Sequence, residues 1–288
     1  MIPQTFNYNC PGSLDEAVKL CIELGDEAKY MSGGHSLIPM MKLRFATPEH
    51  IIDISRIKGL SYIKEEDGML KIGGLTTEYE LEISDLVKAK YPILLDAAKL
   101  IADPSVRNKA TIGGNLAHGD AANDHPAVML ALRATVVAYG ENGSREVSID
   151  DFFHGFYMTA LEHGEILTEI KFKKVEGRTG SAYSKIERKV GDYAASGVAV
   201  NLVLDSSGTC TEAGIGLTNV NPTPMRAERS ENVLRGKVIT EDLIKEAAKY
   251  ASEDCNPSAD LRGSEEYKRS ITGTLTARTI RKALERAN

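Results

Sequence analysis

The sequence lacks several features that would assign it at once to a common functional class. Tryptophan is absent from the 288 residues, and the formal net charge is −6. Proteins whose main task is to grip nucleic acid usually present a basic face, so this charge balance argues against that class. An anionic ligand would have to be held by local groups rather than by the field of the whole molecule.

Long apolar runs and secretion signals are missing as well. No stretch approaches the roughly 18 to 20 apolar residues that a membrane-spanning helix needs. The N-terminal segment MIPQTFNYNC has neither the basic nor the apolar region of a signal peptide. We therefore expect a cytoplasmic protein.

Cysteine is scarce and scattered. The four thiols stand singly, at Cys10, Cys21, Cys210 and Cys255. This spacing differs from the paired motifs that hold zinc and from the runs that hold iron–sulfur clusters. We expect the thiols to be small buried apolar groups without disulfides. If the protein moves electrons, the carrier must be an organic cofactor.

What remains is the composition of an ordinary globular protein, with 42% hydrophobic and 26% charged residues. The length favours two or three domains. The segment EGRTG (residues 176–180) is the best candidate for a boundary because its composition is flexible. Before it, two hairpins are predicted around Gly68 and Gly143. After it, three strands precede two helices, an order typical of an α+β domain.

Residues 103–124 are predicted to form a long irregular loop. The stretch is dense in glycine, asparagine, aspartate and alanine and has little periodicity. Loops longer than an ordinary connection are usually functional or disordered. This one is therefore a candidate for a binding site.

Two segments share one design, residues 31–36 (MSGGHS) and residues 111–115 (TIGGN). A pyrophosphate needs several converging main-chain N–H groups, which glycine permits through positive φ and through its missing Cβ. The first pair opens into a predicted helix over residues 37–44, whose N-terminus is partially positive. Further hydrogen bonds can come from Ser32, Ser36, Thr111 and Asn115. Together the segments predict a pyrophosphate site.

Two alternatives stay open for these glycine pairs. Most such pairs are simple turns, and a third pair, Gly73-Gly74, is interpreted as one. Neither the dinucleotide fingerprint G-x-G-x-x-G nor the phosphate-loop pattern G-x-x-x-x-G-K-[ST] occurs. The sequence therefore supports neither a Rossmann fold nor a P-loop.

A polar cluster follows the second glycine pair and contains His118, Asp120, Asp124 and His125. Two imidazoles and two carboxylates could bind a zinc ion or a hard metal. Alternatively, Asp124 caps the helix beginning near Pro126 while the histidines pack or face solvent. A third interpretation has these groups bind the hydroxyls of a cofactor's ribityl or ribose.

Cations and an aromatic ring lie just beyond the predicted boundary. Lys185, Arg188 and Lys189 are followed by Gly191-Asp192-Tyr193. The cations could simply face solvent, whereas Tyr193 could stack on a ring system at the interface between domains, a usual place for ligand sites.

Five longer motifs carry a resemblance to a known family. They are SGGHSLIPMMKLRFATPEHIIDI, IADPSVRNKATIGGNLAHGDAANDHPA, KIERKVGDYA, IGLTNV and NPSADLRG. The chain closely resembles the FAD-binding medium subunits of aerobic carbon monoxide dehydrogenases, within the xanthine dehydrogenase (molybdenum hydroxylase) family. The match runs from Ile2 to the C-terminal helix. One departure is Ser32, where the family usually has alanine.

The resemblance implies an α+β fold in two parts. Residues 1–177 would form a vanillyl-alcohol-oxidase-type (PCMH-type) FAD-binding domain of two α/β subdomains, about 1–56 and 57–177. Residues 178–288 would form an α+β C-terminal flavoprotein domain, an antiparallel sheet with helices.

The resemblance also implies the residues that contact FAD. The glycine loops would hold the pyrophosphate, the polar loop would contact the cofactor, Lys185 matches a lysine at the domain boundary, and Tyr193 falls near the flavin ring. The implied set is Ser32, Gly33, Gly34, His35, Ser36, Leu37, Ile101, Thr111, Gly113, Gly114, Asn115, His118, Asp120, Asp124, Leu167, Lys185 and Tyr193. No catalytic residue and no metal ligand is expected in this chain.

The implied function is electron transfer through noncovalent FAD. Substrate would be oxidised in a large molybdenum-cofactor subunit, and electrons would pass through a small [2Fe-2S] subunit to this one and on to an acceptor such as a quinone. A dimer of heterotrimers is implied, in the cytoplasm or at the inner face of the membrane. Carbon monoxide is the favoured substrate; aldehydes, xanthine or nicotinate, a self-sufficient FAD oxidoreductase and a metal-dependent hydrolase are the alternatives.

Overall fold

Three larger sheets follow one another along the molecule in the computed structural model, which describes residues 1–287, and a fourth sheet contains only two strands. The strands are β1 (Asn7–Asn9), β2 (Ala28–Met31), β3 (His50–Asp53), β4 (Ile63–Glu66), β5 (Met69–Gly73), β6 (Thr135–Gly140), β7 (Gly143–Ser148), β8 (Phe153–Gly155), β9 (Met158–Thr159), β10 (Ile166–Lys173), β11 (Arg178–Glu187), β12 (Ala194–Leu204), β13 (Cys210–Thr218) and β14 (Met225–Arg226). The α-helices are α1 (Leu14–Leu24), α2 (Leu37–Lys42), α3 (Glu78–Ile83), α4 (Asp85–Lys90), α5 (Pro92–Leu100), α6 (Pro104–Arg107), α7 (Ile112–Ala117), α8 (Asp124–Leu132), α9 (Glu228–Leu234), α10 (Glu241–Asp254) and α11 (Glu265–Ala287).

The N-terminal sheet is small and parallel, in the order β1-β3-β2. Helix α1 packs on it through Ala17, Val18 and Cys21, as the helical spacing of these apolar residues predicts. The Ser13 side chain caps α1 by accepting from the Glu16 N–H. Ser13 and Glu16, three residues apart, predict a capping box. It is half formed, because the Glu16 carboxylate accepts from the N–H of Gly12, rather than from that of Ser13.

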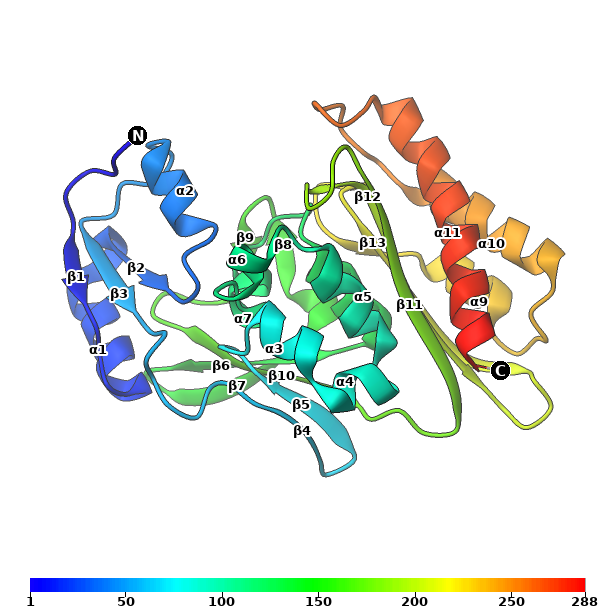
Figure 1. The fold of residues 1–288 in the computed structure, drawn as a ribbon, viewed down its shortest axis with the longest axis horizontal. Helices are drawn as coiled ribbons and strands as arrows, with labels where there is room; N and C mark the ends of the chain where they lie inside the picture. Colours follow the sequence, from blue (N-terminus) through cyan, green and yellow to red (C-terminus); the bar gives the residue numbers. More distant parts are fainter. Residues whose placement is uncertain (288) are drawn as a thin grey trace.

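The central sheet is antiparallel, in the order β4-β5-β10-β6-β7. Both predicted hairpins are confirmed, with Gly68 at φ 74° and Gly143 at φ 88° in their turns. Helices α3 to α5 and α7 lie beside this sheet in Figure 1. Helix α8 is buried along almost its whole length, because α5 and α7 lie on one side of it and the C-terminal strands β12 and β13 on the other.

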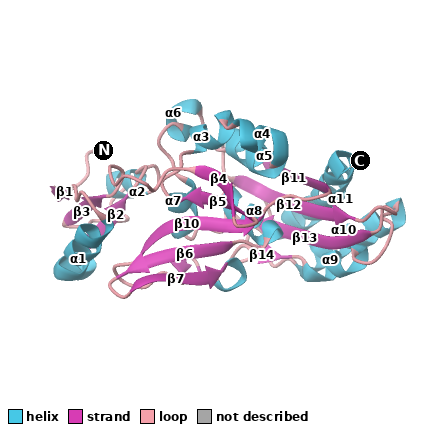
Figure 2. Ribbon diagram, turned by 90° about the horizontal axis from the view of Figure 1, so that it is seen from below, coloured by secondary structure: helices cyan, strands magenta, loops and turns pink. Residues whose placement is uncertain are grey.

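The C-terminal sheet is antiparallel, in the order β11-β12-β13-β14, and α9 to α11 cover its outer face (Figure 1). Figure 2 shows the N-terminal sheet and these helices at opposite ends of the molecule. The α+β fold class is confirmed. Within residues 1–287, no helix is both long and apolar enough to cross a membrane.

The predicted loop over residues 103–124 is wrong in part, because it contains α6 and α7. Asp103 caps α6 and Thr111 caps α7, each through its side-chain oxygen. Helix α7 contains a glycine pair, which intrinsic propensity disfavours. Its buried residues Ile112 and Leu116 contact the core of the central region, which is the central sheet with the helices α3 to α5, α7 and α8. These contacts outweigh that preference.

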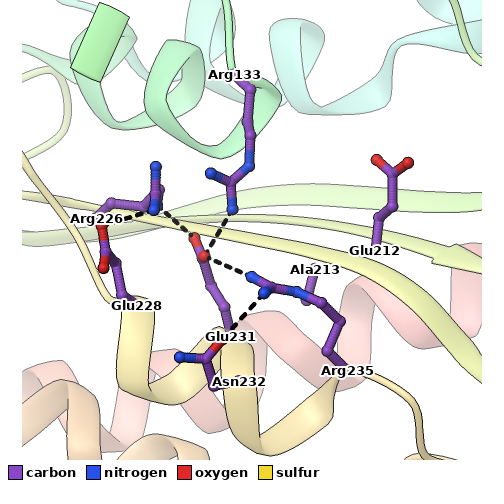
Figure 3. Close-up of a pocket in the computed structure, with 8 residues that line it drawn as sticks. All are labelled: Arg133, Glu212, Ala213, Arg226, Glu228, Glu231, Asn232 and Arg235. Atoms are coloured by element: carbon purple, nitrogen blue, oxygen red, sulfur yellow. Dashed lines mark hydrogen bonds and ion pairs between the residues drawn. The ribbon is translucent and has the colours of Figure 1, made fainter. Parts of the chain in front are cut away.

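Helix α8 and the C-terminal sheet pack at close range. A Cβ added at Gly214 would overlap the carbonyl oxygen of Ala131, and one at Gly216 would overlap that of Ala127. Beside this joint is a polar cavity of about 340 Å³, where Arg133, Arg226 and Arg235 surround the buried carboxylate of Glu231 (Figure 3).

The thiols behave mostly as predicted. Cys21, Cys210 and Cys255 are buried and free, whereas Cys10 is exposed, so the prediction of burial is wrong for Cys10. Burial raises the pKa of the Cys210 thiol to about 11. Cys210 therefore stays protonated at neutral pH and packs as an apolar group.

Candidate cofactor-binding site

A cavity of about 470 Å³ lies between the N-terminal sheet and the central region. This volume is within the roughly 300 to 1,000 Å³ that is usual for small-molecule and cofactor sites. The residues lining it include Ser32, Gly33, Gly34, His35, Ser36, Leu37, Thr111, Gly113, Gly114, Asn115, His118 and Leu167. Most of the residues implied by the resemblance are therefore brought together here.

The loop between β2 and α2 offers this cavity a row of unused donors. Within the described residues 1–287, none of the main-chain N–H groups of residues 32–37 meets an acceptor of the protein. The hydroxyls of Ser32 and Thr111 lie 3.0 Å apart and join this loop to the start of α7. Successive free N–H groups of this kind suit the oxygens of a phosphate.

The glycines serve the site differently from the prediction. Gly34 has φ 73° and needs a left-handed backbone, as predicted. Gly113 and Gly114 instead lie in α7, so the expectation of positive φ is wrong for this pair. A Cβ on Gly114 would lie 2.7 Å from Ser32 Oγ and 2.8 Å from Thr111 Oγ1. The second pair therefore needs the missing Cβ and not an unusual backbone angle.

Close backbone packing explains the other glycines. A Cβ on Gly33 would overlap the carbonyl oxygen of Lys109, and one on Gly113 would overlap that of Gly74. The Gly113 N–H also donates to Gly74 O at 3.0 Å. Gly74 itself lines the cavity, so interpreting the third pair as a simple turn missed a site residue. The repeated Gly-Gly pattern was the signal that could have found it.

Asn115 contributes an unsatisfied acceptor. Its side-chain Oδ1 is buried and has no hydrogen-bond partner, whereas its main-chain oxygen accepts from Asn123 Nδ2 at 2.7 Å. A buried polar atom without a partner costs free energy unless a ligand or water satisfies it. Since Asn115 lines the cavity, a ligand with hydroxyl or N–H groups would fit beside it.

Tyr157 is an aromatic lining residue that the sequence did not reveal. It lies between β8 and β9 at φ 56°, and its N–H donates to Gly119 O at 3.1 Å. Its ring lies 4.8 Å from that of His118, and its hydroxyl donates to Asp120 at 3.4 Å. Burial lowers the pKa of His118, with Asp120 opposing the shift. A neutral imidazole and a phenol thus stand at this part of the wall.

Five of the implied residues do not line the cavity: Ile101, Asp120, Asp124, Lys185 and Tyr193. Lys185 is only 1% exposed and lies 3.3 Å from Asp124 and 3.2 Å from Glu187. Asp124 begins α8 and also accepts from the Tyr183 hydroxyl at 2.6 Å, so it does not cap this helix through its side chain. Burial raises the pKa of Asp124, and Lys185 opposes that shift.

The histidine and carboxylate cluster is divided among separate contacts. His125 points toward Glu78, with Nε2 and Oε2 2.7 Å apart and both side chains fully buried. Asp120 accepts from the N–H of Ala122. Within residues 1–287, no group of three or more histidine, cysteine or acidic side chains is placed to hold a metal ion.

Comparison with known families adds to this geometry. Residues 4–172 match the family described as "FAD binding domain in molybdopterin dehydrogenase". The chain belongs to this family. Residues 181–283 of this flavoprotein match the "CO dehydrogenase flavoprotein C-terminal domain". The predicted family, the order of its two parts and FAD as its cofactor are confirmed.

Individual relatives cover nearly the whole of this flavoprotein. It is 48% identical over 286 residues to the carbon monoxide dehydrogenase medium chain of Hydrogenophaga pseudoflava, covering 99% of each chain. A solved carbon monoxide dehydrogenase structure from the same organism, which lacks the Mo-pyranopterin moiety, matches with a TM-score of 0.96 at 49% identity, covering 99% of each chain. The glyceraldehyde dehydrogenase medium chain of Sulfolobus acidocaldarius is 37% identical over 98% of this chain and 99% of its own.

Proposed function

We propose that this chain is the FAD-binding electron-transfer subunit of an aerobic carbon monoxide dehydrogenase. The observation that carries the proposal is the 48% identity to a carbon monoxide dehydrogenase medium chain across both parts of the molecule. The alternative is the same role in an aldehyde, xanthine or nicotinate dehydrogenase. The 37% identity to a glyceraldehyde dehydrogenase medium chain favours this alternative over unrelated activities.

We propose that the FAD pyrophosphate lies against residues 32–36 and 111–115. Two observations support this placement: the free N–H groups of the first loop, and the close packing of Gly114 against the hydroxyls of Ser32 and Thr111. Leu37 and Leu167 would contact the cofactor elsewhere in the cavity, and Asn115 would satisfy its buried oxygen on it.

The flavin ring is proposed to lie toward His118 and the mouth of the cavity. Tyr157 lines that part of the wall, and its hydroxyl donates to Asp120. Tyr193 comes just after Gly191, whose backbone packs on Ala102, the neighbour of Ile101. Asp124 and Lys185 do not line the cavity, but Lys185 pairs with Asp124 and donates to the main-chain oxygen of Asp192, so the pair would fix the loop that ends at Tyr193. When bound, the flavin supplies the exchange of one or two electrons.

We propose partner subunits because the relatives that this chain matches are described as medium chains. The four cysteines of this chain are dispersed, so the clusters and the molybdenum cofactor would belong to a small [2Fe-2S] subunit and a large subunit. We propose a dimer of such heterotrimers, with a quinone or similar acceptor. Its proposed place is the cytoplasm or the inner face of the membrane.

The purified chain, or its complex with the partner subunits, should carry FAD that is not covalently attached. Among residues 1–287, the cavity is lined by no cysteine, and its two histidines, His35 and His118, belong to a loop and a helix end that already fit the proposed pyrophosphate and ring contacts. Acid precipitation should release the yellow chromophore into the supernatant. Flavin that stays in the pellet, or no flavin in either the chain or its complex, would contradict the proposal.

Substrate oxidation should require the partner subunits. The isolated chain, loaded with FAD, should be reduced by dithionite and reoxidised by a dye or quinone, yet it should not oxidise carbon monoxide, aldehydes or purines. The native complex should reduce the same flavin when given its substrate, and we expect carbon monoxide to outperform the others. Turnover by the single chain would instead indicate a self-sufficient flavoenzyme.

A further inference from the structure

The motif NPSADLRG (residues 256–263) contributes no lining residue to the cavity, yet it forms a well-fixed turn between α10 and α11. Asp260 and Gly263 exchange main-chain hydrogen bonds of 3.1 and 3.2 Å. The Asp260 carboxylate lies 3.0 Å from the ammonium of Lys268, which is 2% exposed. It also accepts from the Arg262 N–H at 2.8 Å. The turn therefore presents the Arg262 side chain in one direction.

Arg262 reaches the loop that ends at Tyr193. Its Nη2 donates to Asp192 Oδ1 at 3.2 Å, and its guanidinium carbon lies 5.4 Å from the centroid of the Tyr193 ring. The same Asp192 oxygen accepts from the Tyr193 N–H at 2.8 Å. One carboxylate thus holds the backbone of Tyr193 and the cation that faces its ring.

The rest of this loop is fixed by other contacts. The Asp192 main-chain oxygen accepts from the buried ammonium of Lys185 at 2.9 Å. Gly191 has φ 81°, and a Cβ there would overlap the carbonyl oxygen of Ala102. Because the backbone is anchored on both sides, the main freedom left is the orientation of the Tyr193 side chain, which is 41% exposed.

The surroundings of the Tyr193 hydroxyl are acidic. Burial raises the pKa of Tyr193 to about 12, and Asp120, Tyr157 and Asp124 add to the rise. The ring is therefore neutral at physiological pH. It can serve as an apolar face toward a ligand on one side while Arg262 faces it on the other.

We propose that Arg262 is a positioning residue, which fixes the orientation of the Tyr193 ring outside the cavity lining and thereby sets the environment of the proposed flavin ring. The inference rests on the proposed FAD site. It assigns to the NPSADLRG motif a role in tuning the cofactor from the C-terminal part of the chain, although Arg262 itself does not contact the cofactor.

The test compares full-length, FAD-loaded variants by flavin absorption spectrum, flavin reduction potential and FAD dissociation constant. Arg262→Ala should shift the spectrum and the potential and weaken FAD binding roughly two- to tenfold, as expected for loss of one cation–ring contact. Arg262→Lys should restore part of the wild-type spectrum, potential and affinity, because it keeps the positive charge but lacks the guanidinium group that donates to Asp192.

A matched control lies in the same part of the chain. Arg229 lies 4.1 Å over the ring of Tyr250 and pairs with Asp254, an equivalent arrangement that is remote from the cavity lining. Arg229→Ala should leave all three flavin readouts unchanged. If Arg262→Ala proves unstable, the comparison of Arg262→Lys with the wild type gives the same test.

A double-mutant cycle decides whether Arg262 acts through Tyr193. In the Tyr193→Ala background, Arg262→Ala should cause no further change in spectrum or affinity. Unchanged flavin properties in a folded Arg262→Ala protein, or an equal added effect in that background, would overturn the inference while leaving the FAD site intact. A wild-type chain that binds no FAD would overturn the proposed function and this inference with it.

Discussion

Replacing Gly114 with valine should abolish FAD binding. Even a Cβ at this position would lie 2.7 Å from Ser32 Oγ and 2.8 Å from Thr111 Oγ1, and the branched side chain would extend further. The two hydroxyls would have to separate, although they join the β2–α2 loop to the start of α7. The free N–H groups of residues 32–37 would then lose their alignment toward the cavity. Flavin occupancy, read from the absorbance of the purified chain, is the measurement.

Gly34→Val should give the same result for another reason. Gly34 has φ 73°, a conformation that a β-branched residue strongly disfavours, so the loop itself would change shape. His118→Ala should cost much less, at most one hydrogen bond of about 1 kcal/mol, or roughly fivefold in affinity.

Gly12→Val provides the matched control for the valine substitutions. Gly12 is exposed, and a Cβ there would have open space apart from the end of the Glu16 side chain at 3.7 Å. It should retain full flavin occupancy. Equal occupancy in the Gly34, Gly114 and His118 variants would mean that the glycine pairs do not hold the cofactor.

The second large effect is expected on stability, from Glu231→Ala. The Glu231 carboxylate is fully buried and lies 2.8 Å from Arg133, 3.1 Å from Arg235 and 3.3 Å from Arg226 (Figure 3). It also accepts from the Ile215 N–H at 3.0 Å. Burial raises the pKa of Glu231, with that N–H and the arginines opposing the shift. The arginines and the Ile215 N–H therefore favour the ionised form, against the effect of burial.

Removing that carboxylate should lower the free energy of unfolding by roughly 3 kcal/mol, since it leaves a buried N–H without an acceptor and breaks a buried ion-pair network. Arg235→Ala should cost less than about 1 kcal/mol, because Arg235 is 40% exposed and its pairing is screened by water. Urea unfolding measures both.

Because of the position of Arg133, this network tests how α8 is held against the C-terminal part of the chain. Arg133 ends α8, beside the central region, whereas Glu231 lies in α9 behind the C-terminal sheet. Glu231→Ala should therefore destabilise the packing of α8 against the C-terminal sheet, and it should have a smaller effect on the affinity for flavin. An unchanged urea midpoint would show that close packing at Gly214 and Gly216 holds the joint without the ion pairs.

Local signals in the sequence were enough for some of the regular elements. Helical spacing with a serine cap predicted α1, and glycines available for positive φ predicted both hairpins of the central sheet. The same local reasoning failed at α7, because two glycines in a row argue against a helix when only neighbours along the chain are considered. It also missed the helices α6 and α9 and the short strands β1, β8, β9 and β14, whose ranges are too brief for a clear period.

The candidate site divides in a similar way. The glycine pairs and their polar neighbours could be selected from the sequence because a phosphate demands those residue types. Gly74 carried the same Gly-Gly signal but was interpreted as a turn. Tyr157 could not be selected, because it stands at positive φ in a short hairpin that the sequence did not reveal. Lys185 and Asp124 were selected through the resemblance, yet the structure places them behind the cavity wall.

The sequence by itself therefore determined the family, the α+β class and the cofactor class, and it predicted the two segments proposed to hold the pyrophosphate. These depend on residue type and on spacing along the chain. Only the tertiary structure decided why Gly113 and Gly114 must lack a Cβ, and that Arg262 reaches Tyr193. Both depend on contacts between segments far apart in the chain, whose distances are set by how the three sheets pack and not by any local pattern.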